Sequence, residues 1–472
     1  MTNERIEADP GSFRDPSGQV FYSKGRVFRT LNEEATARFK SIINGTGFSD
    51  LVARGLILQA TEINDDQLFD EVGTSTGRTP TAILEHPKLP FISYPYEWPF
   101  ELLKRAALLH LDLHLAALSH NLSLVDGTAY NVQFIAQKPI FIDVLSLVPY
   151  REGDYWLGYR QFCEQFLAPL LLMSKTGIPY HPWYRGALDG LSISDVNRTL
   201  PFSAKLNWAT FLHIVLHAKM DKTAQDSASP SPVRKRQGPS RNGLVGILTS
   251  LRSLISSVQP KGSTETIWRQ YEITTSYSSH EAEKKRAFIA RFCEAVQPAM
   301  FWDLGCNSGE YSETALQTGA KYAVGFDFDH GALDAAVARA TERQLNFLPL
   351  MLDATNPSPN QGWNQRERSG LAERSSADAL IALAFLHHLV VGKNVPLIQA
   401  LDWITKLAPT GIIEFVPKAD PKLKHMLASR EDIFANYDVE NMRACLGNIA
   451  TIVEEQQVSS TGRVLFWYRR PL

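Results

Sequence analysis

The chain has 472 residues, 44% of them hydrophobic, and a formal net charge of -2. This length exceeds one ordinary hydrophobic core and predicts two or three domains, while neither the charge nor any apolar run indicates nucleic-acid binding or a membrane-spanning helix. The cysteines lie far apart, without a CxxC or Cys/His cluster, which argues against a disulfide framework and a zinc site. We therefore expect no metal and a reducing compartment, the cytoplasm. The cysteines are Cys163, Cys293, Cys306 and Cys445.

The first elements along the chain predict a small sheet followed by a long helix. Hairpin turns favour glycine, and helices favour an asparagine N-cap followed by acids in the first turn. The predicted elements are a hairpin around Gly25, a helix after Asn32, strands at 56–58 and 91–94, and a helix at 100–118.

A group of polar residues then lies between positions 123 and 143. Asp126 is followed by Asn131 and by a predicted hairpin that returns to Asp143. This spacing resembles the catalytic loop and metal-binding acid of the protein-kinase and aminoglycoside-phosphotransferase fold. By that resemblance Asp126 would be the base, and Asn131 and Asp143 would hold magnesium. The resemblance implies an α+β, two-lobe kinase-like domain over residues 1–220.

Departures from the kinase pattern predict that this domain is degenerate. Leu124 and Val125 stand where His-Arg is expected, residues 144–145 replace Phe-Gly, and no glycine-rich loop precedes them. Arg29 lies near the expected place of the nucleotide-binding lysine. A capped turn at Asp126 would use the same residues. An active phosphotransferase, a nonphosphorylating kinase-like fold and a purely structural turn therefore stay open.

Residues 221–243 predict a linker, because they are rich in Ser, Pro and cations and poor in large apolar side chains. The basic run at 234–236 is expected to be solvated. Apolar residues then recur at helical spacing, which predicts a connecting amphipathic helix within 244–265 that packs on a neighbouring domain. Residues 266–472 form the last predicted domain.

This last domain is organised around residues 301–310, with the sequence FWDLGCNSGE. The pattern predicts a buried strand that ends in a glycine turn and opens a helix, whose N-terminus favours polar ligands. Asp303 would lie near the carboxyl end of the strand, where open α/β sheets bind ligands. Gly305 and Gly309 leave room for a ligand beside the backbone, but their G-x-x-x-G spacing is not the dinucleotide fingerprint.

Further strands end in polar residues at the same edge of the predicted sheet. Asp327 ends the run at 321–328, and Asp353 follows the run at 347–352. A fourth, fully buried strand is predicted at 378–383. A fifth strand is predicted from Gly411, with Glu414 unusually placed inside it, and runs near 451 and 464 would complete the sheet.

These motifs, in this order, resemble a class I S-adenosylmethionine-dependent methyltransferase, and the chain as a whole resembles methyltransferases of the bacterial nodulation-protein kind. The resemblance implies an α/β, Rossmann-like sheet and S-adenosyl-L-methionine as cofactor. It implies that Asp327 would bind the ribose hydroxyls and Asp353 the adenine amino group. The cofactor-binding residues implied at the glycine turn, for the methionine part, are Asp303, Gly305, Asn307 and Gly309.

Two histidines, His387 and His388, follow the fourth predicted strand at the ligand-facing edge. Either is a candidate general base for an acceptor, because histidine titrates near neutral pH, and a role in shaping the pocket is the alternative. Another pair, His110 and His114, lies four residues apart on the first long helix. That pair has no third ligand nearby, so packed side chains are expected there and not a metal site.

The sequence therefore predicts methyl transfer from S-adenosyl-L-methionine to an oxygen, nitrogen or carbon atom. The acceptor is expected to be a small molecule or a glycan, with a protein as the alternative, and no membrane or nucleic acid is expected as partner. The kinase-like domain would bind substrate or regulate the enzyme. The alternatives are a phosphotransferase with a regulatory cofactor-binding domain and a noncatalytic protein that senses the cofactor.

Overall fold

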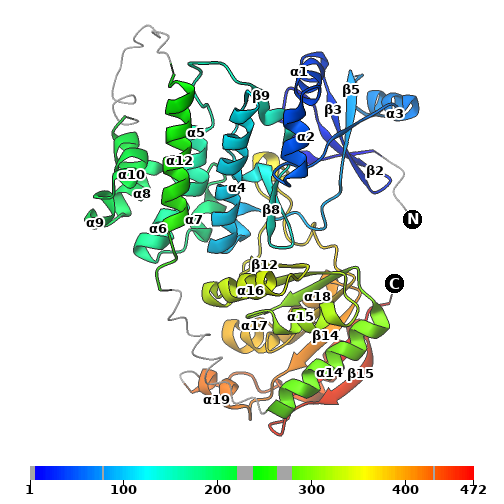
Figure 1. Ribbon diagram of the computed structural model, residues 1–472. Helices are drawn as coiled ribbons and strands as arrows, with labels where there is room; N and C mark the ends of the chain where they lie inside the picture. The colour runs from blue at the N-terminus through cyan, green and yellow to red at the C-terminus, as the bar shows by residue number, and fades with distance from the viewer. Residues whose placement is uncertain (1–5, 77–78, 221–237, 263–278, 429–430, 472) are drawn as a thin grey trace.

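The computed structural model describes residues 6–76, 79–220, 238–262, 279–428 and 431–471. Figure 1 shows two bodies, one above the other: an N-terminal body of residues 6–262 and a C-terminal body of residues 279–471. Most of the predicted linker, 221–237, lies outside the described residues, as does 263–278. Within the described ranges, no helix combines the length and the apolar character needed to cross a membrane.

The N-terminal body begins with a five-stranded antiparallel sheet of order β1-β2-β3-β5-β4. Its predicted hairpin is present and turns at Lys24 and Gly25, both at positive φ. The predicted helix cap is also present, because the Asn32 side chain accepts a hydrogen bond from the Ala35 amide at 2.8 Å. The elements are β1 (Glu7–Ala8), β2 (Val20–Ser23), β3 (Arg26–Leu31), α1 (Glu33–Ile43), α2 (Thr46–Ala53), β4 (Thr61–Ile63), α3 (Asp66–Thr76) and β5 (Ala82–His86).

The rest of this body is mainly helical and surrounds α4 (Phe100–Ser119). Two short antiparallel pairs follow α4: β6 (Leu122–Leu124) with β9 (Leu147–Pro149), and β7 (Val132–Ile135) with β8 (Lys138–Phe141). The helix predicted within 244–265 is α12 (Arg241–Ser257), which packs its apolar face on α4. The other helices are α5 (Tyr159–Phe162), α6 (Ala168–Thr176), α7 (His181–Gly186), α8 (Ile193–Thr199), α9 (Phe202–Lys205) and α10 (Trp208–Thr210), with π-helical turns at Cys163–Leu167 and Phe211–Leu216. The kinase-like character of this body stays a prediction.

Two predicted strands are wrong. In the run 56–58, only Ile57 makes an isolated bridge, to Phe141, and residues 91–94 form no strand. The run at 91–94 is apolar for a different reason, because Phe91 packs edge-to-face on Trp302 of the C-terminal body with ring centroids 5.8 Å apart. Two strands of the observed sheet, β4 and β5, were not predicted.

The C-terminal body holds a seven-stranded sheet of order β12-β11-β10-β13-β14-β16-β15. The first five strands are parallel, and β16 pairs antiparallel with both of its neighbours. The prediction of a Rossmann-like sheet is therefore confirmed. The strands are β10 (Met300–Leu304), β11 (Tyr322–Asp327), β12 (Phe347–Met351), β13 (Ala379–Ala382), β14 (Thr410–Phe415), β15 (Thr451–Gln457) and β16 (Val464–Arg469).

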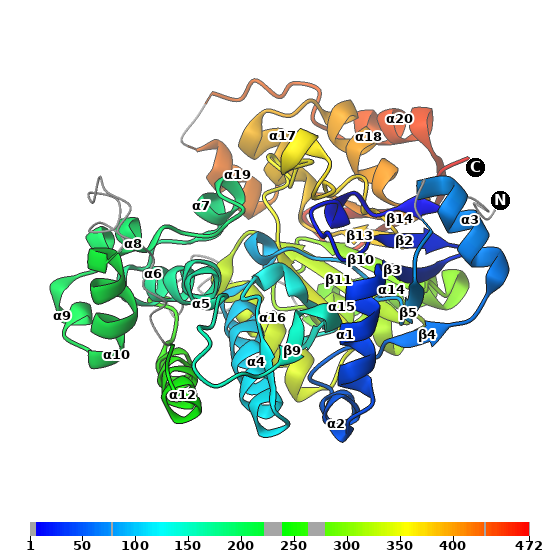
Figure 2. The ribbon, with the colours of Figure 1, turned by 90° about the horizontal axis from the view of Figure 1, so that it is seen from above.

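Helices cover both faces of this sheet, so alternate residues of β10 enter different cores. Phe301 packs in a cluster with Phe288 and Phe292 of α14, whereas Trp302 packs toward the N-terminal body. Figure 2 shows α17, α18 and α20 grouped together, well away from α16, which packs on α4 of the N-terminal body. The helices are α14 (Ser279–Val296), α15 (Glu310–Gln317), α16 (His330–Glu342), α17 (Leu386–Lys393), α18 (Leu397–Leu407), α19 (Pro421–Leu427) and α20 (Val439–Ile449).

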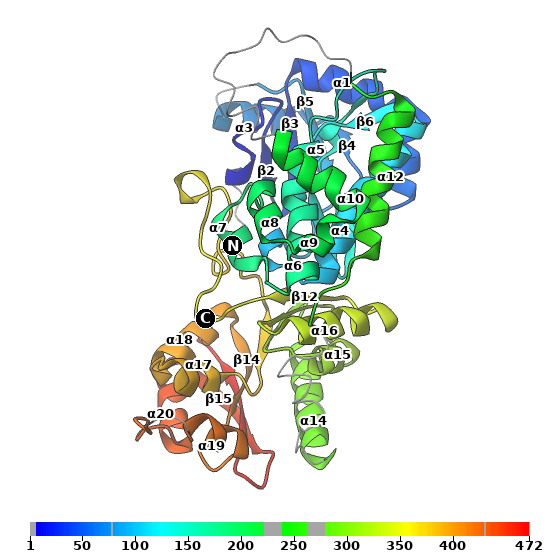
Figure 3. The same ribbon diagram turned by 90° about the vertical axis from the view of Figure 1, so that its left-hand side faces the viewer.

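The segment between β12 and β13 joins the two bodies, and in Figure 3 it is the yellow chain that runs up beside α7. Arg374 in this segment forms a buried ion pair with Glu97, with side chains 7% and 4% exposed, and donates to the Ile92 carbonyl at 2.7 Å. The Ser369 amide also donates to the Tyr94 hydroxyl oxygen at 3.0 Å. This segment, which follows the end of β12, is thus anchored to the N-terminal body.

Candidate cofactor and acceptor site

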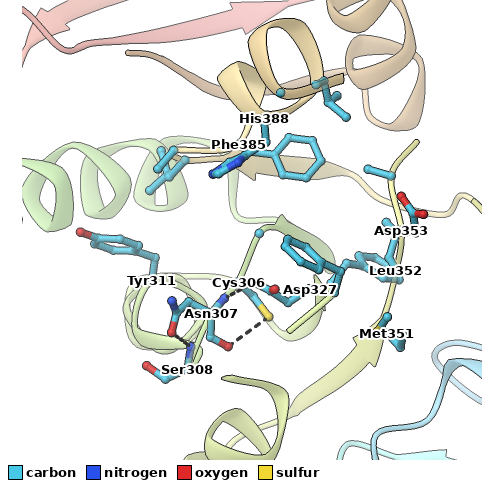
Figure 4. Close-up of a pocket in the computed structure, with 18 of the residues that line it drawn as sticks. Cys306, Asn307, Ser308, Tyr311, Asp327, Met351, Leu352, Asp353, Phe385 and His388 are labelled. Carbon is cyan, nitrogen blue, oxygen red and sulfur yellow. Dashed lines mark hydrogen bonds between the residues drawn. The ribbon is translucent and has the colours of Figure 1, made fainter. Parts of the chain in front are cut away.

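A cavity of about 580 Å³ opens at the carboxyl ends of the central parallel strands. The sheet order reverses between β10 and β13, and open α/β sheets bind ligands at that point. Figure 4 shows the glycine turn on one side of the cavity and Phe385 and His388 on the opposite side. Asp353 and Leu352 lie on a third side, at the end of β12.

The glycine turn after β10 contributes only some of its predicted residues to the cavity wall. Gly305, at φ +79°, and Asn307 line the cavity. Gly309, at φ +81°, is outside the lining, and a Cβ atom there would lie 2.4 Å from the ring of Phe347. Glycine is therefore needed at 309 for its backbone conformation and for packing at the start of α15.

Asp303 is also outside the cavity lining. Its carboxylate is only 2% exposed and accepts a hydrogen bond from the Ser312 hydroxyl at 2.7 Å. Burial raises the pKa of Asp303 to about 7. In this structure the side chain fixes the start of α15 against β10, and its contact with the methionine part of the cofactor stays a prediction.

Asp327 and Asp353 both line the cavity, at the ends of β11 and β12. The Asp327 carboxylate accepts hydrogen bonds from the amides of Asn307 at 2.9 Å and Asp329 at 3.0 Å, and burial raises its pKa. One oxygen of Asp353 accepts hydrogen bonds from Thr355, through its amide at 2.9 Å and its hydroxyl at 2.7 Å. A carboxylate has about four acceptor positions, so each acid keeps acceptor capacity for a ligand.

The two histidines that follow β13 lie in different environments. His388 lines the cavity, and burial and the charge of Lys422 lower its pKa to about 4. His387 is 1% exposed and outside the lining, and burial holds its pKa well below the usual value. A neutral His388 at neutral pH can accept a proton, although this pKa makes it a weak base.

A buried charge network behind the cavity was missed from the sequence. Glu414 on β14 is fully buried and accepts hydrogen bonds from the Lys285 ammonium at 2.9 Å and the Ala384 amide at 2.8 Å. Ala384 has a φ of +47°, a strained conformation for a residue with a side chain, and it lines the cavity. Arg463 links Glu414, at 3.2 Å, to Asp420, at 2.7 Å. The one available signal was a charged residue inside the apolar run of β14.

The group predicted near Asp126 does come together in the N-terminal body. The Asn131 amide nitrogen lies 3.1 Å from an Asp126 oxygen and 3.4 Å from an Asp143 oxygen. Arg29 of β3 forms ion pairs with both Asp143 and Asp15. Burial tends to raise the pKa of Asp143, but Arg29 and hydrogen bonds outweigh it and hold the pKa below the usual value.

The predicted histidine pair on α4 is completely buried. His110 lies within hydrogen-bond distance of the Asp126 carbonyl, at 3.0 Å, and His114 of the Ser123 hydroxyl, at 2.9 Å. Over the described ranges, no group of three or more His, Cys, Asp or Glu side chains is placed to hold a metal ion.

Several solved structures are similar to part of the chain. The N-methyltransferase NodS from Bradyrhizobium japonicum WM9 is 16% identical, with a TM-score of 0.31, and the match covers 41% of this chain and 99% of NodS. NodS in complex with S-adenosyl-L-homocysteine is 14% identical, with a TM-score of 0.31, over 43% of this chain and 92% of NodS. The magnesium protoporphyrin IX methyltransferase ChlM from Synechocystis PCC 6803, with bound SAH, is 19% identical, with a TM-score of 0.31, over 43% and 93%.

No family model matches the chain. A curated protein matches almost the whole of it: nodulation protein NoeA of Rhizobium meliloti (strain 1021) is 42% identical over 462 residues, which cover 98% of this chain and 95% of that protein. The predicted resemblance to nodulation proteins is confirmed, and the chain belongs to the family of nodulation protein NoeA.

Proposed function

We propose that the protein is a methyltransferase that uses S-adenosyl-L-methionine. The observation that carries the proposal is the position of two carboxylates, Asp327 and Asp353, at the ends of neighbouring strands in one cavity with the glycine turn. A nucleoside ligand has two ribose hydroxyls and an exocyclic amine, which are hydrogen-bond donors for such carboxylates.

The residues present fit this cofactor. Asp327 would accept hydrogen bonds from the ribose hydroxyls and Asp353 from the adenine amine, beside the apolar wall made by Met351 and Leu352. A Cβ atom at Gly305 would lie 3.2 Å from the Phe385 ring across the cavity, so glycine keeps the space between the turn and Phe385 open. The bound cofactor supplies a methyl group activated on a sulfonium.

The protein's part in the reaction is mainly orientation, because methyl transfer needs the acceptor in line with the methyl carbon. His388 is the histidine we propose to face the acceptor, and Ala384 and Phe385 shape the wall beside it. The neutral His388 would receive a proton from an acceptor group. His387, behind it, would support the position of α17.

We further propose that the N-terminal body is a kinase-like domain that does not transfer phosphate. Asp143 is already paired with Arg29, which also pairs with Asp15. A magnesium site would need the Asp143 carboxylate available to a metal. Substrate binding or regulation is therefore the proposed role. A working phosphotransferase with a regulatory second domain and a noncatalytic cofactor sensor are the alternatives.

The acceptor is proposed to be a small molecule or a glycan, with a protein as the alternative, and the location is proposed to be cytoplasmic. The four cysteines support a reducing compartment, because each is a free thiol and three of them are buried: Cys163, Cys293 and Cys306.

Calorimetry of the full chain with S-adenosyl-L-homocysteine and a chelator tests the cofactor. We expect binding to the wild type and at least about tenfold weaker binding to Asp327→Asn, since charge-assisted hydrogen bonds contribute roughly 1.5–3 kcal/mol. Asp402→Asn, which removes an exposed carboxylate of α18, is the matched control. Binding that is absent from folded wild type would refute the cofactor assignment.

Turnover is tested separately with labelled cofactor and fractionated cell extract. Release of S-adenosyl-L-homocysteine together with a labelled product identifies a methyltransferase. Cofactor binding without any labelled product across small-molecule, glycan and protein fractions would favour the sensor alternative.

A further inference from the structure

Several large apolar side chains are exposed at the end of the N-terminal body that lies away from its small sheet. Figure 2 shows α8, α9 and α10 grouped there, on the other side of α4 from α1, α2 and α3. Phe202, Leu206 and Trp208 are 76%, 69% and 71% exposed. Trp208 stacks on Phe211 with ring centroids 6.1 Å apart, and α10 contacts α9. We call Phe202, Leu206, Trp208 and Phe211 the apolar end surface.

Helices that pack on the core hold this surface in place. Asn207 caps α10, because its side chain accepts a hydrogen bond from a backbone amide of that helix at 3.1 Å. In the next turn, His213 is 1% exposed, and its ring nitrogens lie 2.8 Å from the Tyr159 hydroxyl and 3.1 Å from the Ser250 hydroxyl of α12. The exposure of the apolar end surface is therefore set by the fold.

The apolar area exposed here is large for the surface of a protein. A buried aromatic side chain removes about 150–250 Å² from water, so Phe202 and Trp208 together expose on the order of 300 Å². The largest apolar patch on a typical soluble monomer covers about 300–600 Å², and such patches are often functional. Each Å² left in water forgoes roughly 25 cal/mol of stabilisation. We therefore expect a partner to cover this surface.

The sequence around this surface is basic, although the whole chain is not. Residues 196–220 contain three Lys and Arg and no Asp or Glu, and one of these cations, Lys205, lies in the last turn of α9. Through residue 241, the sequence holds eight Lys and Arg against two Asp, in a chain whose net charge is -2. This end of the protein should therefore attract an anionic surface, whereas two copies of the chain meeting through it would repel each other.

We propose that the apolar end surface docks on an anionic lipid bilayer. Phe202, Leu206 and Trp208 would enter the boundary between head groups and acyl chains, and Lys205 would lie among the anionic head groups. Interfacial helices combine exposed Trp, Phe and Leu with Lys or Arg in this way, without a spanning run.

This proposal departs from the sequence-based expectation that no membrane is a partner. That expectation rested on the total charge and on the lack of a spanning run, and neither bears on a peripheral contact. The proposal does not depend on methyl transfer. It agrees with the cytoplasmic location proposed above, because the anionic leaflet of a cell membrane faces the cytoplasm.

Co-sedimentation of the full chain with lipid vesicles tests the proposal. We expect the wild type to bind vesicles of phosphatidylcholine and phosphatidylglycerol, and to bind phosphatidylcholine alone at least about tenfold more weakly. The double variant Phe202→Ser with Trp208→Ser should bind the anionic vesicles at least about tenfold more weakly than wild type. Ile433→Ser is the matched control, because it removes a side chain that is 61% exposed on the C-terminal body.

Charge is tested separately from apolar contact. Lys205→Glu reverses the charge of α9 and should weaken binding to the anionic vesicles at least about fivefold. Raising the salt concentration should weaken wild-type binding as well, because salt screens charges at the surface. Circular dichroism checks each variant, and the substituted side chains of the double variant are exposed, so the fold should be kept.

The outcomes that overturn the proposal are specific. One is a wild type that does not sediment with the anionic vesicles, and another is a folded double variant that binds them as tightly as wild type. Sedimentation velocity without vesicles measures self-association. A wild-type dimer that the double variant converts to a monomer would also overturn the proposal and would identify a second copy of the chain as the occupant.

Discussion

Replacing Glu414 by glutamine should destabilise the C-terminal body and weaken cofactor binding. The substitution keeps an acceptor for the Ala384 amide but removes the charge that balances Lys285 and Arg463. All three charged side chains are at most 4% exposed, and breaking a buried ion pair by neutralising one partner costs about 3–5 kcal/mol. Loss of the charge balance should let the side chain at 414 shift and weaken the hydrogen bond that holds Ala384 at positive φ, which loosens the wall beside the cofactor.

Lys285→Met provides the comparison, because it leaves Glu414 paired with Arg463 and should cost only about 1–3 kcal/mol. Urea unfolding followed by circular dichroism measures both variants, and hydrogen exchange assigns the transition to the sheet around β13 and β14. Affinity for S-adenosyl-L-homocysteine is measured under native conditions. A Glu414→Gln effect below about 1 kcal/mol, or no larger than that of Lys285→Met, would contradict the charge balance argued for this network.

Three further outcomes are expected. The folded-state pKa of Asp303, about 7, exceeds its ordinary 3.8, so the folded wild type binds the extra proton between these values and loses stability as pH rises. Asp303→Asn removes this titrating group, so its free energy of unfolding should fall less as pH rises, by up to about 1.4 kcal/mol per pH unit. Urea unfolding of both proteins at pH 5 and pH 8 measures the difference. Arg374→Met leaves Glu97 buried without its cation and should cost about 3–5 kcal/mol, seen as earlier proteolysis between the two bodies; equal proteolysis would refute the role of the pair. Wild type should not turn over ATP with magnesium, and Asp143→Asn should keep cofactor affinity; ATP turnover lost in this variant would instead identify a working kinase.

The strands of the C-terminal sheet were predictable because each leaves a local pattern. A parallel strand buried on both faces is a short apolar run, and its ligand-facing end is marked by a polar residue or a glycine. Asp327 and Asp353 were located in this way, and both line the cavity. The same reasoning failed at 91–94, where the apolar residues serve contact between the two bodies and not a strand.

The direction of each side chain was not predictable from the pattern. Asp303 is two residues before Gly305, but it lies behind the turn and binds Ser312. His387 and His388 are neighbours on α17, and only the second reaches the cavity. These differences depend on how a turn and a helix are rotated against the sheet, which three-dimensional packing decides.

The lysines around the cavity could not be recognised from the sequence, for a further reason. Lys285 and Lys422 are 137 positions apart and lie on helices at opposite ends of the domain's sequence, where single lysines normally mark a solvated face. The significance of Lys285 comes from its burial beside Glu414, because a buried charge requires a partner. Only the charge inside β14 gave a local hint.

The N-terminal body is also part of the site's construction, although none of its described residues lines the cavity. Asp353 stands at the start of the segment that Arg374 and Ser369 tie to Glu97 and Tyr94. At the other end of β11 from Asp327, the Ala136 amide donates to the Tyr322 hydroxyl at 2.8 Å. Strand ends held by another body keep their spacing only while that body stays docked. The geometry of the two carboxylates is therefore a property of the whole chain, which explains why the sequence of the C-terminal half alone could indicate the residues but not their arrangement.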